Sequence, residues 1–405
     1  MKTNKCITAV VLAAAMGIAA CNNAEYEPLV GDGSEVVYIS EASTGVTRDL
    51  VLDKDFVETQ IQIRLAQPSN HDIRVKLALS QEVLDQTCKL LGNVYSIYPE
   101  EALTFPDEVT IQAGNIYSGP FIVKIDNTID SEGESYALPF KIVSCEGAAI
   151  SQSSSSFCFT ITKEIGEVSV PVFGTGTSCS TQFAPTDTKW DETYPEATIE
   201  FWVCQTGFEI NNQAILTAGS KDDSNDEVYA RFGDADYNGR YDYLQIKVYG
   251  AQQKFDTGNP HEEGKALMPN KWYHFAMVFN RGEYRLYKNG VEVAHHSGGN
   301  EMLDTDQLIL CQSGMRQDKT YMCELRLWKT ARTPDQIKQY MFVQPSYRDP
   351  NLILYAPMHE GEDNNGIFED KSGHGHDGAM GNQGNGPSAI TWTKVNLSSS
   401  NTSLQ

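Results

Sequence analysis

The feature that most constrains this chain is a long series of short segments in which apolar and polar side chains alternate. A period of two places successive side chains on opposite faces of a β-strand, and turn residues separate the segments. In the first half the segments are EVVYIS, TQIQIRLA, DIRVKLALS, EVTIQAG, FIVKID, YALPFKIVSC and SFCFTITK, and later ones include ATIEFWVCQTG, QAILTAG, EVYARFG, YLQIKVYG, EYRLYKNGVEVAHH and YMCELRLWKT. The sequence therefore predicts an all-β fold that begins with an antiparallel sandwich.

The length and the composition along the chain indicate two domains. The 405 residues are 40% hydrophobic, enough for two globular cores. Residues 163–180, KEIGEVSVPVFGTGTSCS, are rich in Gly, Ser and Thr and are typical of a domain junction. We therefore expect a first domain over 35–163, a linker over 164–180, a second domain over 181–395 and a disordered polar tail over 396–405.

Two segments depart from the strand pattern and predict helices. SQEVLDQTCKLLG has apolar residues at helical spacing. In ARTPDQIKQYM, Thr333 can cap a helix, Pro334 suits its first position, and Gln336 completes a capping box. Asn289-Gly290 lies between two alternating runs and predicts a type I′ hairpin turn.

The first residues have the features of an export signal. Lys2 and Lys5 precede an apolar stretch that is too short to span a bilayer, and it ends in Ile18-Ala19-Ala20-Cys21. This ending resembles a bacterial lipobox, which implies a signal peptide over 1–20, lipidation of Cys21 and a tether over 21–34. The alternative is an ordinary signal peptide without lipidation. With lipidation, the lipid anchor is the only contact with the membrane.

The net charge of the chain excludes one class of partner. Removal of residues 1–20 takes away two lysines and no acidic residue, so the formal charge moves from −23 to −25. Such an acidic surface argues against nucleic acid as a partner.

The cysteines leave their redox state open. After loss of Cys6 and lipidation of Cys21, seven of nine cysteines remain, and none forms a CxxC motif. Cys145 with Cys158, and Cys311 with Cys323, could pair across strands. Buried free thiols are the alternative.

Several stretches of the first domain resemble a family of domains of unknown function. They are VVYI, YPEEALTFPDEVTIQAGNIYSGPFIVKI, GESYALPFKIVS and FCFTITK. The family stands at the head of surface lipoproteins of polysaccharide-degrading gut anaerobes. The resemblance implies an Ig-like β-sandwich and an anchor in the outer membrane, facing the cell surface or the periplasm, and it transfers no catalytic residue.

Four stretches of the second domain resemble another family. ATIEFWV, NKWYHFAMVFNRGEYRLYKNGVEVA, CELRLWKTARTPDQI and LILYAPMHEGEDNNGIFEDKSGHGHDGAM are similar to signatures of the laminin-G/pentraxin-like, concanavalin-A-like superfamily, in the expected order. The resemblance implies a jelly-roll β-sandwich of two curved antiparallel sheets. It also implies binding of glycans or proteins, often with calcium.

The stretch FGDADYNGRYD carries the candidate metal ligands. Asp234, Asp236 and Asn238 have the alternate spacing of oxygen ligands that opens a calcium loop. Asn238-Gly239 is also a strong hairpin signal between EVYARFG and YLQIKVYG. Flanking strands exclude a helix–loop–helix calcium site, and Gln245 stands where its bidentate glutamate would be. We therefore predict a hairpin connection, with Ca²⁺ at a rim loop as the metal candidate.

Three tyrosines near this stretch are the candidate ligand-binding residues. An aromatic ring can stack on the apolar face of a sugar while its hydroxyl hydrogen-bonds. Tyr237, Tyr241 and Tyr243 are suited to that role, and cross-strand packing is the alternative.

The sequence offers little for catalysis. A glycoside hydrolase needs two carboxylates that face each other across the scissile bond. No strand carries such a pattern, and Glu200 and Glu324 are single acids that we expect to be hydrogen-bonded strand residues. We therefore expect a non-catalytic surface lipoprotein that binds a glycan and supports polysaccharide capture. A protein-binding adhesin or assembly partner of outer-membrane proteins, and a divergent glycoside hydrolase, are the alternatives.

Overall fold

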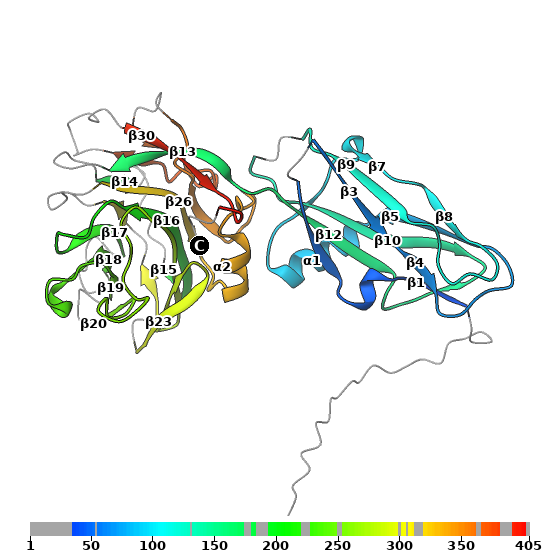
Figure 1. Ribbon diagram of the computed structural model, residues 1–405, viewed down its shortest axis with the longest axis horizontal. Helices are drawn as coiled ribbons and strands as arrows, with labels where there is room; N and C mark the ends of the chain where they lie inside the picture. Colours follow the sequence, from blue (N-terminus) through cyan, green and yellow to red (C-terminus); the bar gives the residue numbers. More distant parts are fainter. Residues whose placement is uncertain are drawn as a thin grey trace, which may run out of the picture.

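The computed structural model shows two β-rich domains joined through a direct contact (Figure 1). It describes residues 35–52, 55–129, 132–173, 180–183, 193–219, 227–248, 253–298, 301–304, 307–311, 319–361, 366–380 and 391–401. The signal segment, the tether and Cys21 lie outside the described residues.

The first domain is the predicted β-sandwich, in which antiparallel pairs predominate and three pairs of the described strands are parallel. One layer has the strand order β2 (Thr47–Val51), β12 (Ser156–Thr162), β10 (Tyr136–Glu146), β5 (Ile73–Leu79) and β8 (Glu108–Ile111), with β6 (Ser96–Ile97) beside β10. The other layer contains two small sheets. One has the order β11 (Ala149–Ile150), β1 (Val36–Ile39) and β4 (Ile63–Leu65), and the other has the order β3 (Phe56–Ile61), β9 (Phe121–Asp126) and β7 (Leu103–Thr104).

Alternation in the strands builds the core of this domain. Ile73, Val75 and Leu77 of β5 are buried, whereas Arg74 and Lys76 between them are exposed. The buried set packs against the opposite layer in one cluster. Two short 3₁₀ turns, η1 (Glu41–Ser43) and η2 (Glu100–Ala102), connect strands.

Helix α1 (Gln81–Leu91) confirms the first helix prediction. The Ser80 hydroxyl accepts the amide N–H of Val83 at its start, and Gly92 ends it in the left-handed region at φ +61°. Val83 and Leu84 pack the helix onto β10 and β12.

The second domain is a jelly-roll sandwich of two large sheets. The first, here called the inner sheet, has the order β23 (Val291–Ser297), β22 (Glu283–Lys288), β21 (Trp272–Asn280), β16 (Glu196–Gln205), β26 (Thr320–Trp328), β13 (Gly166–Phe173) and β30 (Thr391–Leu397), with β27 (Leu352–Ala356) beside β26. The second, the outer sheet, has the order β20 (Gln253–Asp256), β19 (Leu244–Val248), β18 (Val228–Phe232), β17 (Gln213–Gly219), β25 (Gln307–Leu310), β14 (Thr181–Phe183), β29 (Gly378–Met380) and β28 (Ile367–Phe368). A small pair, β15 (Thr193–Tyr194) and β24 (Leu303–Asp304), lies apart.

The two sheets enclose the main core of the molecule. Phe201 and Phe275 of the inner sheet and Leu216, Ala230 and Ile246 of the outer sheet belong to one buried cluster. The other face of the inner sheet is covered by helix α2 (Pro334–Tyr340), whose Ile337 packs on Ala276, Val278 and Tyr287 in a separate small cluster. Thr333 and Gln336 form the predicted capping box.

Domain boundaries differ from the prediction in two places. Residues 166–173, expected within the linker, form β13 of the inner sheet. Asn396 and Leu397, expected in the disordered tail, belong to β30, and Leu397 is fully buried. Residues 174–179, which hold most of the Gly, Ser and Thr of the junction segment, lie outside the described residues.

The described cysteines are all free thiols. They are Cys88, Cys145, Cys158, Cys204, Cys311 and Cys323. Cys158 lies opposite Pro139 and Cys145 opposite Val75, so this first pair does not meet across strands. Within the described part of the chain, no helix is long and apolar enough to cross a membrane.

Candidate functional site

The stretch FGDADYNGRYD forms the hairpin connection between β18 and β19, as predicted. The last paired residues are Phe232 and Leu244. The loop between them contains the 3₁₀ turn η4 (Ala235–Tyr237), and Asn238 and Gly239 follow it with φ of +47° and +80°. The Asn-Gly pair thus turns the chain inside a longer loop and does not join the strands directly.

The acidic side chains of this loop are engaged by cations of the outer sheet. Asp234 pairs with Arg231, and its second cationic neighbour is Lys247, with Nζ at 3.9 Å. Asp236 pairs with Lys254 and accepts a hydrogen bond of 2.7 Å from Gln245 Nε2. Burial would raise the pKa of Asp234, but the Ala235 amide and the nearby cations hold it below its usual value.

These contacts do not fit a calcium site at Asp234, Asp236 and Asn238. A calcium ion needs six to eight oxygen ligands, and the two carboxylates here are already neutralised by ammonium and guanidinium groups. Among the described residues, no group of three or more His, Cys, Asp and Glu side chains is placed to hold a metal ion.

The three candidate tyrosines have different environments. Tyr243 is fully buried, and its ring meets the ring of Tyr237 edge-on at 4.8 Å. Tyr237 is partly exposed and donates its hydroxyl to Asp256 Oδ2 at 3.0 Å. Tyr241 is half-buried and packs directly against Gly233. A Cβ added to Gly233 would lie 2.4 Å from the Cβ of Tyr241. Tyr243 is therefore a packing residue, whereas stacking of Tyr237 and Tyr241 on a ligand stays a prediction.

Around this loop, the outer sheet presents a group of polar side chains on the side away from the core. In β18, Ala230 and Phe232 belong to the core, so Tyr229 and Arg231 point to the opposite side. The β-ladder places Arg231 opposite Gln245 and Tyr229 opposite Lys247. We call this set the polar face; its members are Asn212, Tyr229, Arg231, Asp234, Asp236, Gln245, Lys247 and Lys254.

Arg231 organises the polar face. Its Nε and Nη2 donate to Gln245 Oε1 at 3.1 and 2.8 Å, and its Nη1 donates to Asn212 Oδ1. Its guanidinium carbon lies 5.8 Å from the centre of the Tyr229 ring. Because Arg231 is only 5% exposed, these contacts hold the surrounding amide and carboxylate groups in fixed positions.

The polar face has the chemistry of a binding surface for a hydroxylated ligand. Amide, carboxylate, ammonium and phenol groups supply both donors and acceptors to sugar hydroxyls, and an aromatic ring can contact an apolar sugar face. Sequence reasoning missed Tyr229, Arg231, Gln245 and Lys247. The sequence could have indicated them, because they are the polar positions that alternate with the core positions of EVYARFG and YLQIKVYG.

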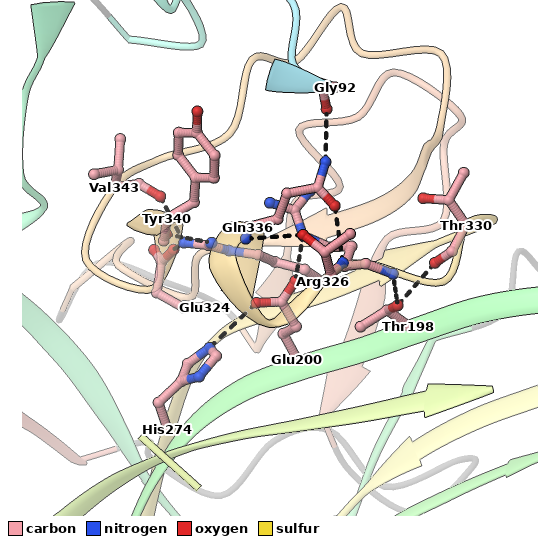
Figure 2. Close-up of polar contacts among 12 residues, drawn as sticks. Gly92, Thr198, Glu200, His274, Glu324, Arg326, Thr330, Gln336, Tyr340 and Val343 are labelled. Atoms are coloured by element: carbon pink, nitrogen blue, oxygen red, sulfur yellow. Dashed lines mark hydrogen bonds and ion pairs between the residues drawn. The ribbon is translucent and has the colours of Figure 1, made fainter. Parts of the chain in front are cut away.

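A second polar cluster lies on the inner sheet and is fully buried (Figure 2). Glu200 Oε1 lies 3.1 Å from Arg332 Nε, and Glu200 Oε2 lies 3.3 Å from His274 Nε2. Burial alone would raise the pKa of Glu200, but the Arg332 charge and the His274 hydrogen bond lower it to about 2. Burial also lowers the pKa of His274, which favours the neutral ring.

Glu324 completes this cluster. It sits at a bulge in β26 with φ of +57°, pairs with Arg326 at 2.5 Å and accepts the Tyr355 hydroxyl at 2.9 Å. Both Glu200 and Glu324 are at most 1% exposed. The sequence predicted hydrogen-bonded strand residues at both positions; Glu324 is hydrogen-bonded to Arg326 and Tyr355, and Glu200 is ion-paired with Arg332.

Comparisons with known proteins agree with this architecture. A family model described as an N-terminal domain matches residues 32–149, and a model described as the concanavalin A-like lectin/glucanases superfamily matches residues 175–338. No curated protein matches the chain.

Several solved structures are similar to this chain at low identity. A candidate carbohydrate-binding protein from Bacteroides ovatus is 19% identical with a TM-score of 0.53, over 88% of this chain and 97% of that one. A pentraxin from Limulus polyphemus is 15% identical with a TM-score of 0.32, over 43% of this chain and 82% of that one. Domain 4 of an arabinanase from Geobacillus stearothermophilus, in complex with arabinotriose, is 16% identical with a TM-score of 0.29, over 38% of this chain and 70% of that one.

The family matches, the two-sheet jelly roll and the shared fold converge on one assignment. The chain has a concanavalin A-like second domain, which follows a first domain that matches the model of an N-terminal domain family.

Proposed function

We propose that this protein is a non-catalytic glycan-binding protein, and that the polar face is its glycan site. The observation that carries the proposal is the Arg231 network, which fixes the amide of Asn212 beside the partly exposed ring of Tyr229, while the buried Gln245 holds Arg231 in place. Fixed planar donors and acceptors next to an aromatic ring are the usual means of reading sugar hydroxyls. The candidate carbohydrate-binding protein with the same two-domain fold is consistent with this role.

The proposal extends to the location of the protein. Cleavage before Cys21 and lipidation of that residue would tether the two domains to the outer membrane, where a glycan-binding face supports polysaccharide capture. Calcium is not part of this site, because cations of the protein already neutralise Asp234 and Asp236.

A glycan array with residues 22–405, which lack the lipidation site, in the presence and absence of calcium, tests the proposal. We expect a glycan to bind with an affinity that calcium does not change. Tyr229→Ala and Lys254→Ala each remove a polar-face group whose side chain reaches solvent, and each should weaken binding about tenfold, equivalent to about 1.4 kcal/mol.

Tyr117→Ala is the matched control, because Tyr117 is 59% exposed on the first domain. It should leave binding unchanged. Absence of binding to every glycan would contradict the function, and full binding by both polar-face variants would contradict the site. Release of new reducing ends from a bound glycan would show that the protein is catalytic.

A further inference from the structure

A cavity of about 420 Å³ lies between the two domains, away from the polar face. The first domain lines it with Tyr98, Tyr136 and Ile129, among others, and the second with Tyr347 and His359. Its volume falls within the range of pockets that hold small ligands.

Direct contacts between the domains hold the two walls of this cavity in place. The Tyr347 amide donates to Gly133 O at 3.0 Å, and the hydroxyls of Tyr95 and Tyr340 are hydrogen-bonded at 2.7 Å. The Tyr95–Tyr340 contact is itself buried. The cavity is therefore built into the arrangement of the domains, so a ligand would not have to order it.

Gln336 of α2 adds hydrogen bonds to the contact between the two domains. Its Nε2 donates to the carbonyls of Leu91 and Gly92 at 3.3 and 3.2 Å, and the second contact is drawn in Figure 2. The residue that completes the capping box of α2 thus also binds the end of α1.

The lining of the cavity combines apolar and hydroxyl-binding groups. Tyr136 and Tyr347 supply rings, and Ile129 and Val343 supply aliphatic surface. Such walls suit a ligand with one apolar face and several hydroxyl groups.

The charges of the lining select against anions. Four glutamates line the cavity and only two lysines do; they are Glu132, Glu134, Glu164 and Glu360 against Lys163 and Lys371. Lys371 Nζ is shared between Glu369 at 2.7 Å and Glu132 at 3.6 Å, and Glu134 is paired with Arg348, so the acidic excess of the lining rests on Glu164 and Glu360. Burial lowers the pKa of His359 despite the nearby Glu324, which leaves the ring neutral.

We propose that the interdomain cavity is a second saccharide site, which takes one or two neutral or amino-sugar units and rejects acidic sugars. It rests on the proposed function only in the class of ligand, because it shares no residue with the polar face. A saccharide held here contacts both domains at once and stabilises their contact.

Titration of the mature chain with simple sugars tests the proposal. The probes are glucose, mannose, galactose, the 2-amino derivative of each, and glucuronic acid, with binding followed by calorimetry and by the thermal midpoint. We expect at least one neutral or amino sugar to bind at least tenfold more tightly than glucuronic acid. Comparison of each hexose with its 2-amino derivative shows whether the cavity prefers neutral sugars or amino sugars.

Gln344→Trp fills the cavity from the second domain and should reduce this binding at least tenfold. Gln112→Trp is the matched control, because Gln112 is exposed on the first domain away from the cavity. Ile129→Trp fills the cavity from the other wall and replaces Gln344→Trp if that variant does not fold.

The outcomes separate the two sites. Tyr229→Ala should leave binding in the cavity unchanged, so loss of array binding in that variant with intact sugar titration supports both sites. Sugar binding that survives both cavity-filling variants, equal binding of glucuronic acid, or no binding of any probe would overturn this proposal and leave the polar face untouched.

Discussion

Glu200 links the buried charge cluster to the stability of the second domain. In Glu200→Gln the guanidinium of Arg332 loses its carboxylate partner at 3.1 Å while it stays buried. Breaking a buried pair in this way costs about 3–5 kcal/mol. We expect a loss of that size in the free energy of unfolding at pH 7, measured by urea denaturation.

The effect of Glu200→Gln should depend on pH in a defined direction. The pKa of Glu200 is lowered from 4.5 to about 2 in the folded protein, so its stabilising contribution is complete above about pH 4.5 and is lost as the pH falls toward 2. The difference between wild type and variant should therefore shrink over that range.

Glu196→Gln is the matched control for this measurement. Glu196 lies on the same strand, and its partner Arg281 is 64% exposed, so the substitution should cost less than about 1 kcal/mol. A difference between wild type and Glu200→Gln that stays constant from pH 7 to pH 3 would contradict the assignment.

Single residues also show where sequence reasoning ends. Glu200 and Glu324 were expected to be structural because each stood alone in an apolar strand. Arg231 was missed because its importance depends on Asn212, Asp234 and Gln245, which meet it only after β17, β18 and β19 have paired. The spacing of Asp234 and Asp236 could not reveal that sheet cations occupy both carboxylates.

At the scale of elements, the start of α2 is a testable unit. The Thr333 hydroxyl accepts the Gln336 amide at 3.2 Å, and Gln336 Oε1 accepts the Thr333 amide at 2.9 Å. Thr333→Ala removes the first of these bonds and should lower the free energy of unfolding by about 1 kcal/mol in thermal or urea denaturation.

Thr128→Ala controls for loss of a threonine hydroxyl, because Thr128 is exposed in a turn of the first domain. It should change stability by less than about 0.5 kcal/mol. An equal effect of the two substitutions would show that the capping box contributes nothing to the helix.

The sequence predicted an element well where the residues that stabilise it lie within the same short stretch. The capping box at Thr333 and the Asn289-Gly290 turn, with φ of +50° and +74°, are such cases. β13 was missed because its partner β30 lies more than 200 residues away. Its Pro171 is accommodated because pairing with β26 involves only Val172 and Phe173.

At the scale of the whole molecule, the contact of Tyr347 with the first domain requires a glycine at position 133, because a side chain there would meet the Tyr347 ring. The φ of Gly133 is +72°, and an added Cβ would lie 2.3 Å from the Tyr347 ring. Gly133→Ala should therefore push Tyr347 away and break the bond from its amide to Gly133 O. We expect faster hydrogen exchange at the Tyr347 amide and loss of sugar binding in the interdomain cavity.

Gly114→Ala separates this effect from backbone strain. Gly114 has φ of +82° in the same domain, but an added Cβ meets nothing within 4 Å. Both substitutions carry the cost of a left-handed alanine, about 1–2 kcal/mol, whereas only Gly133→Ala displaces a residue of the other domain. Equal exchange at the Tyr347 amide in the two variants would mean that the domains are not held by this contact. Since the cavity has walls from both domains, glycan binding at the polar face should survive in Gly133→Ala even where binding in the cavity is lost.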